Sequence, residues 1–143
     1  MRSPLRILVL LTAALALSAT VALGAAPKPG NWKATKVQRG YDLEFKVANG
    51  EVSKVVGHVL ENCTGESTSD TTTFAPSGSY KVKNGRFSGN RRTTYKGGGV
   101  LIEKFAGRFT GAGKAKGTLL MKFGIAGTVC TTYKLKWTAK RGG

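Results

Sequence analysis

The chain has 143 residues, with 23 Lys and Arg against seven Asp and Glu and a formal net charge of +16. At this length, with 41% hydrophobic residues, it can bury one modest core, and no second domain of ordinary size fits. The charge excludes an ordinary balanced surface and predicts either an anionic partner or a strongly solvated basic exterior.

The N-terminal segment has the three-part plan of a secretory signal peptide. Arg2 and Arg6 precede an uncharged apolar run from Ile7 to Leu17, and small residues follow up to Gly24. We expect cleavage after Gly24, although a cut after Ala26 satisfies the same small-residue rule. The alternative is an uncleaved membrane anchor, because apolar character continues almost to the length of a membrane span. In both cases the rest of the chain faces outward.

We therefore divide the chain into a signal peptide, residues 1–24, and a secreted or envelope-exterior domain, residues 25–143, with no membrane span left after cleavage. The second part holds 21 Lys and Arg against seven acidic residues, a formal charge of +14. Outside a cell, the anionic candidates are acidic polysaccharides, phosphate-bearing wall polymers, lipid headgroups and nucleic acid. The alternative is that Lys side chains only protect sheet edges from association.

The two cysteines, Cys63 and Cys130, both belong to the exported part. In an oxidising compartment an isolated pair predicts one disulfide. We expect no metal site, because His58 is the single histidine and the chain has no Cys-x-x-Cys motif. No cofactor is expected either.

Short alternating segments and turn signals dominate the rest of the chain. Nineteen glycines spread over residues 25–143 leave little room for helices. Tyr41 to Val47 alternates and meets Asn49-Gly50, a strong hairpin signal, so Glu51 to Leu60 is the expected return strand. Loops are expected at Glu66 to Thr71 and Gly89 to Arg92. Further strands are expected at Thr72 to Ala75, Ser79 to Val82, Arg86 to Ser88, Val100 to Phe105, Gly107 to Thr110 and Lys116 to Phe123.

The last alternating segment is Thr128 to Arg141. One face of the predicted strand is apolar and carries Tyr133, Leu135, Trp137 and Ala139. The other face carries Lys134, Lys136, Thr138 and Lys140. We expect the apolar face to join Leu43, Phe45 and Val47 in one core, and the lysines to form an exposed stripe that binds anionic polymers. Because such a stripe acts by charge alone, we do not expect specific nucleic-acid recognition.

Eight or nine short strands with a turn about every ten residues predict an all-β fold, a single antiparallel β-sandwich or barrel. Five short elements follow one another along it: Gly30-Asn-Trp32, Asn49-Gly50, Cys63, Gly107-Arg-Phe-Thr-Gly111, and Cys130 with Trp137-Thr-Ala139. In this combination the chain resembles small secreted bacterial all-β proteins of an uncharacterised family. The resemblance implies a Gram-positive-type exported domain and carries over no catalytic residue. The Gly-x-Trp element is also similar to the first strand of lipocalin and avidin barrels, whose further motifs this chain lacks.

The sequence offers little catalytic chemistry. His58 is the one side chain with an ordinary pKa near neutrality, but no Gly-x-Ser-x-Gly elbow occurs, so we expect a structural or solvent-facing histidine and no enzyme. Gly97-Gly98-Gly99 lacks the Gly-Lys-Ser/Thr ending of a phosphate loop. Three hypotheses follow: a non-catalytic domain that binds anionic polymers, a closed barrel that encloses an apolar ligand, and a hydrolase or hydrolase inhibitor acting through a loop such as Glu66 to Thr73.

Overall fold

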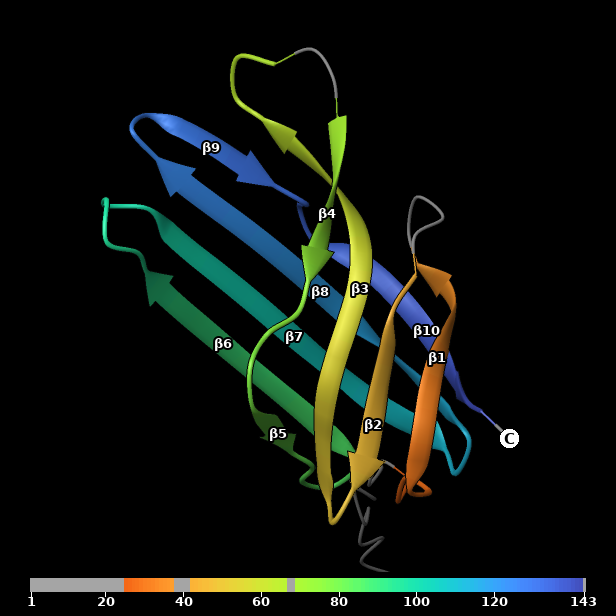
Figure 1. Cartoon of the computed structure of the whole chain (residues 1–143). Coiled ribbons are helices and arrows are strands. Elements are labelled where there is room, and N and C mark those ends of the chain that lie inside the picture. Colours follow the sequence, from red (N-terminus) through yellow and green to blue (C-terminus); the bar gives the residue numbers. More distant parts are fainter. Residues whose placement is uncertain (1–24, 38–41, 67–68, 143) are drawn as a thin grey trace, which may run out of the picture.

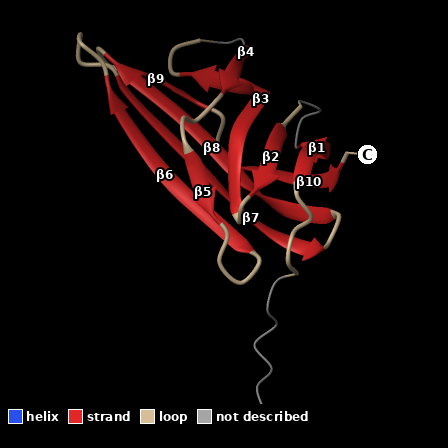
Figure 2. Ribbon diagram, turned by 60° about the horizontal axis from the view of Figure 1, so that its bottom comes forward, coloured by secondary structure: helices blue, strands red, loops and turns tan. Residues whose placement is uncertain are grey.

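The computed structural model of the chain describes residues 25–37, 42–66 and 69–142, with the backbone alone for Lys36. The expected signal peptide and Tyr41 lie outside these ranges. The described part is all-β, as predicted, and its ten strands run antiparallel to their neighbours (Figures 1 and 2). The strands are β1 (Gly30–Val37), β2 (Glu44–Ala48), β3 (Glu51–Cys63), β4 (Ser69–Phe74), β5 (Ser79–Lys81), β6 (Arg86–Thr94), β7 (Val100–Gly111), β8 (Lys114–Ile125), β9 (Thr128–Thr131) and β10 (Leu135–Arg141).

Six strands close a barrel in the order β1–β2–β3–β9–β8–β10, and β10 returns to β1. The four other strands lie outside this ring. On one side β7 pairs with β8 and β6 with β7, so that β6, β7 and β8 form a long sheet that crosses β3 at a steep angle (Figure 1). On the other side β4 and β5 pair with successive parts of β3.

Two Asn-Gly pairs make hairpin turns where the sequence predicts them. Asn49 and Asn84 have φ angles of 51° and 50°, and the glycines that follow have 72° and 69°. Two successive positive φ angles are typical of the type I′ turn, whose twist matches that of antiparallel strands. The first turn sets the β2–β3 register, and the second joins Lys83 to Arg86 before β6.

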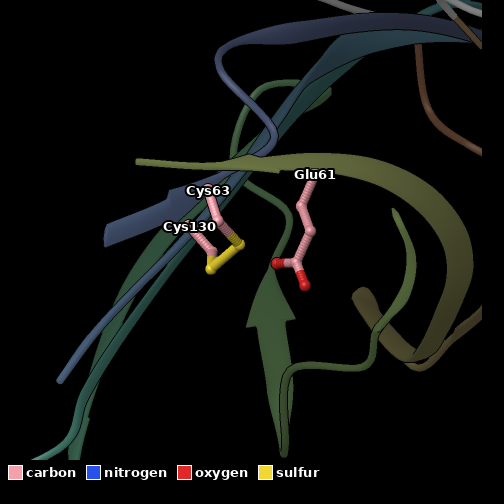
Figure 3. Close-up of side chains that lie close together, drawn as sticks. All are labelled: Glu61, Cys63 and Cys130. Atoms are coloured by element: carbon pink, nitrogen blue, oxygen red, sulfur yellow. A yellow bond between two sulfur atoms is a disulfide. The ribbon is translucent and has the colours of Figure 1, made fainter. Parts of the chain in front are cut away.

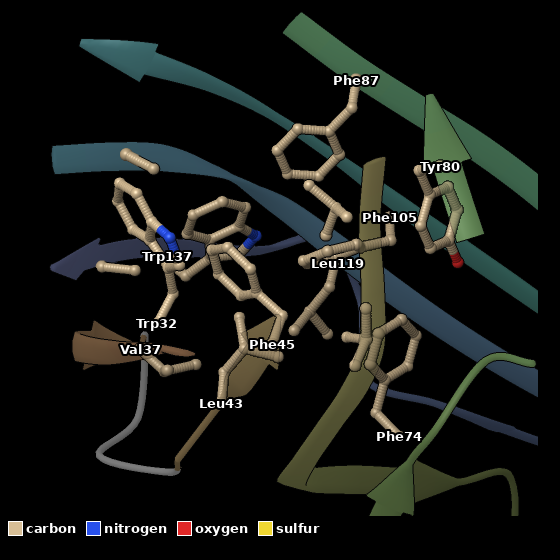
Figure 4. Packing of buried hydrophobic residues seen from close by; sticks show 14 of the residues in the cluster. Trp32, Val37, Leu43, Phe45, Phe74, Tyr80, Phe87, Phe105, Leu119 and Trp137 are labelled. Atoms are coloured by element: carbon tan, nitrogen blue, oxygen red, sulfur yellow. The ribbon is translucent and has the colours of Figure 1, made fainter. Parts of the chain in front are cut away.

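Five residues that the alternation assigns to the core are confirmed there. Leu43, Phe45, Val47, Leu135 and Trp137 are each at most 2% exposed. Aromatic rings from β1, β2, β4, β5, β6, β7 and β10 fill the space between the barrel wall and the β6–β7–β8 sheet (Figure 4). Burial of this apolar surface is the main force that holds the strands together.

The barrel closes through a short seam between β3 and β9. Only two residue pairs form it, Asn62 with Thr131 and Cys63 with Cys130. The predicted disulfide joins Cys63 to Cys130, which are 67 positions apart in sequence (Figure 3). Two hydrogen bonds between Thr64 and Val129 continue the contact beyond the ladder. The covalent bond therefore lies where the barrel has the fewest ladder contacts.

The strands differ from the prediction in number and length. There are ten, and three of them have 12 or 13 residues, because glycine does not interrupt them. The two strands expected on either side of Ala106 form one strand, β7, and the loop expected at Gly89 to Arg92 is part of β6. β1, with Gly30-Asn-Trp32, was not among the predicted strands, and Trp32 is buried in the core.

Tyr133 was predicted to lie in the core, and this is wrong. The expected strand from Thr128 to Arg141 breaks into β9 and β10, and Tyr133 between them is 58% exposed with a φ of 54°. Thr132 takes the inward place instead and is fully buried, with its backbone N–H donating to the Met121 carbonyl and its hydroxyl accepting from the Met121 N–H. The break shifts the alternation by one residue, so Tyr133 points outward.

Candidate anion-binding face

Charge is separated between two sides of the molecule. Six of the seven acidic residues fall between Asp42 and Asp70, on or beside β2, β3 and β4. Strands β6, β7, β8 and β10 carry one acidic residue, Glu103, which is buried at 7% exposure. The solvent on that side of the described structure therefore meets cations without neighbouring carboxylates.

We call the surface of β6, β7, β8 and β10 that points away from the core the outer face. Alternation places every second side chain there, while most of the intervening side chains point toward the core. Nine exposed cations belong to it: Arg86, Arg92, Lys104, Arg108, Lys114, Lys116, Lys122, Lys136 and Lys140. In the described part of the chain, the ion pairs join Lys33 to Glu44 and His58 to Asp42, and none uses these nine.

The three lysines singled out from the sequence are all exposed. Lys136 and Lys140 lie on β10, on the outer face, and Lys134 lies in the link that precedes this strand. Lys140 stands opposite Lys114 of β8 and Lys33 of β1. The lysine stripe predicted from the sequence is therefore one edge of a larger basic surface. Residues 71–143 hold 15 Lys and Arg and one Glu, a bias that could have indicated this surface from sequence.

Four cations stand in line across the strands, and we call them the cation row. Lys83 is bridged to Arg86, Arg86 pairs with Arg108, and Arg108 pairs with Lys116. Neighbouring strands are about 4.8 Å apart, so the row places a positive side chain at each step. The next position, on β10, is Thr138, which lies between Lys136 and Lys140.

The row borders a shallow groove of about 940 Å³ on the outer face. Lys81 and Lys136 also line it, and its floor consists of small residues, among them Ser88, Ala106 and Thr118. Gly107 and Gly117 are paired beneath this floor, and on the inner side of the sheet a Cβ on either residue would collide with the Trp137 ring. Close packing of that indole in the core therefore requires these two glycines.

The single histidine has a structural partner. The β2 ladder on β3 ends at Val56 and the β9 ladder begins at Asn62, which leaves the backbone of His58 without a strand partner on that edge. The Asp42 carboxylate accepts hydrogen bonds from the His58 backbone N–H at 2.8 Å and from ring Nδ1 at 2.9 Å. The backbone hydrogen bond lowers the pKa of Asp42 below its ordinary value. The pair is exposed and serves to cap the strand.

Glu61, Cys63 and Cys130 lie close enough to suggest a metal site (Figure 3). The two sulfurs are bonded to each other, however, and a disulfide offers no thiolate. What remains is one carboxylate, whose pKa is raised by burial and then by Asp70 and Glu66. In the oxidised protein this cluster has too few ligands for a metal ion.

Glu103 is the one buried acid, and it faces the interior opposite Arg91 and Met121. Burial raises its pKa above the ordinary value of 4.5, and Arg91 offsets part of that effect. The Arg91 guanidinium lies 5.0 Å from the centre of the Tyr80 ring and donates to the Ser79 carbonyl. Sequence alternation did not identify this inward-facing polar pair.

We expect Glu103→Gln to stabilise the fold near neutral pH. The pKa of Glu103 is higher in the folded protein than in the unfolded chain. Its ionisation therefore lowers the free energy of unfolding as the pH rises through these two pKa values. The unfolding midpoint of the wild type should therefore fall more between about pH 4 and about pH 7 than that of the variant. Thermal unfolding across this range measures the effect, with the exposed Glu66→Gln as control. If the two variants have the same pH profile, Glu103 ionises without a burial penalty.

No family model matches the chain, and the searches of curated proteins and of solved structures also found no match. The described residues contain no helix long and apolar enough to cross a membrane. The fold and the face described above are therefore the basis for a functional assignment.

Proposed function

We propose that this protein is a secreted, non-catalytic β-domain that binds anionic polysaccharides or phosphate-bearing polymers of the cell envelope or matrix through its outer face. The observation that carries the proposal is the separation of charge: nine exposed cations on four strands, with the one acid of those strands buried. A surface of one sign creates a potential that attracts polyanions and releases their counterions on binding. The disulfide is compatible with an oxidising exterior.

The structure favours this proposal over the two alternatives. An apolar ligand needs space inside the barrel, and nineteen buried hydrophobic side chains pack the described interior (Figure 4). A hydrolase needs a base aimed into a cleft. The imidazole of His58 is instead exposed, and its partner, the Asp42 carboxylate, also accepts a hydrogen bond from the His58 backbone N–H.

We expect salt-sensitive retention of the protein on immobilised heparin or phosphocellulose at low ionic strength. Replacing Lys134, Lys136 and Lys140 together by Gln should reduce the slope of log affinity against log salt by about two to three units, if each lysine neutralises one anionic group as in nucleic-acid complexes. The matched control replaces Lys46, Lys54 and Lys96, which lie off the outer face, and removes the same charge. Equal losses would show diffuse attraction by net charge, and no binding by the wild type at low salt would refute the proposal.

A further inference from the structure

We infer that the cation row is the site at which a single linear polymer bearing phosphate or sulfate groups binds, and that the polymer chain crosses the strands at right angles instead of running along one of them. This inference rests on the proposed function. It adds the position of the site, the direction of the bound chain and the chemical class of its charged groups.

The row carries a cost to the fold. Directly opposed like charges destabilise an antiparallel pair, and Arg108 faces a cation on both sides, Arg86 and Lys116. None of the three shares an ion pair with any carboxylate in the described structure. Solubility alone does not require this alignment, because the same charges at staggered positions would solvate the sheet equally well. A bound polyanion removes the repulsion.

The cations are closer together across the strands than along them. Across the strands, the backbone positions of successive cations in the row are about 5 Å apart. At this spacing, neighbouring anionic groups of a linear polymer can each contact one cation of the row. Along β7, by contrast, Lys104 and Arg108 are four residues apart, which is about 13 Å in an extended strand. A chain lying along one strand would therefore meet fewer cations per unit of its length.

The surface beside the row has a shape that suits a linear polymer. The groove floor of small side chains lets a polymer backbone approach the sheet closely while its charged groups reach the cations. Ser88 and Thr118 add hydroxyl groups to this floor. At the β10 end the row leads to Thr138, where Lys136 and Lys140 flank the path. Arginine forks in the row match the paired oxygens of phosphate or sulfate.

The experiment compares two triple variants that remove the same formal charge, three positive charges each, at different places on the outer face. The row variant is Arg86→Gln, Arg108→Gln and Lys116→Gln. The matched variant is Arg92→Gln, Lys104→Gln and Lys122→Gln, which uses the same three strands and the same face. In the matched set no cation stands directly opposite another, because the partners are Ile102, Asn90, Leu120 and Thr131. The probes are linear polyphosphate, heparin, and polygalacturonate as a carboxylate-only polymer.

We expect the row variant to lose at least tenfold in affinity for polyphosphate or heparin at low salt, with a salt slope smaller by about two to three units. The matched variant should lose less than one unit. The row variant should also unfold at a higher temperature than the wild type at low ionic strength, since it lacks the opposed charges. A purely structural role would lower the melting temperature and the affinity together.

The outcomes separate the two proposals. If the wild type binds and both variants weaken equally, the outer face binds polyanions without a defined row, and this inference is overturned while the proposed function stands. Binding of polygalacturonate as tight as that of both phosphate and sulfate polymers would overturn the assigned chemical class. No wild-type binding to any of the three probes would refute the proposed function, and the row with it. Polyphosphate and heparin binding compared at equal charge concentration identifies which source of the oxyanion is preferred.

Discussion

Phe105→Ala should remove about 3 to 5 kcal/mol from the free energy of unfolding. Phe105 lies at the middle of β7 and is fully buried. Its ring centre lies 5.3 Å from Phe87, 5.4 Å from Trp137 and 5.6 Å from Tyr80, so that it joins β5, β6 and β10. Truncation would leave a cavity bordered by rigid rings, which have little freedom to close it.

Urea unfolding of the variant and of the wild type measures this cost. A small domain has a total stability of about 5 to 15 kcal/mol, so the variant should be partly unfolded at 37 °C or close to it. Val56→Ala is the control, because Val56 is 43% exposed on β3 and should cost less than about 1 kcal/mol. If Phe105→Ala cost no more than Val56→Ala, the β6–β7–β8 sheet would not be packed on the barrel as described.

Loss of the disulfide should cost about 4 kcal/mol, because it closes a loop of 67 positions and its removal restores the conformational freedom of that loop in the unfolded chain. The folded state is also affected locally. The β3–β9 seam consists of two residue pairs, so we expect the amides of β9 to exchange with solvent faster after reduction than those of β8.

Chemical unfolding with and without a thiol reductant measures the loss, and the Cys63→Ser/Cys130→Ser variant should match the reduced wild type. That variant should not respond to reductant, which controls for other effects of the reagent. Thiol labelling of the denatured, unreduced wild type provides an independent check. Stoichiometric labelling of both cysteines would show that the bond does not form in the isolated protein.

The strands and turns were largely predictable because their signals are local. Alternation of apolar and polar residues at β2 and β10 follows from the two-residue period of an extended strand, and Asn-Gly favours the positive φ angles of a tight hairpin. The core positions Phe45 and Trp137 followed from the same alternation. The disulfide followed from a count of two cysteines in a chain that the sequence predicts to be exported.

The sequence-based predictions were wrong where a local sequence pattern is compatible with two structures. An isolated glycine permits a strand to end but does not require it, so β7 continues through Gly107 where its backbone packs over Trp137. In the sequence, Tyr133 continues the alternation of apolar and polar residues. In the structure its positive φ angle breaks the strand, and Thr132 is the buried residue instead. Only packing against the rest of the molecule decides between such options.

Composition and alternation alone predicted a basic all-β domain with lysines on the outer side of its last strand, and the structure has this fold. The cation row depends on the tertiary structure, because its members come from β6, β7, β8 and the turn before β6. Whether Arg108 stands opposite Arg86 and Lys116 depends on strand register, and a slip of one residue would turn every side chain of a strand to the other face. The fit of Phe87, Phe105 and Trp137 in the core sets that register, and in this way the buried aromatic side chains place the charges on the opposite surface of the same sheet.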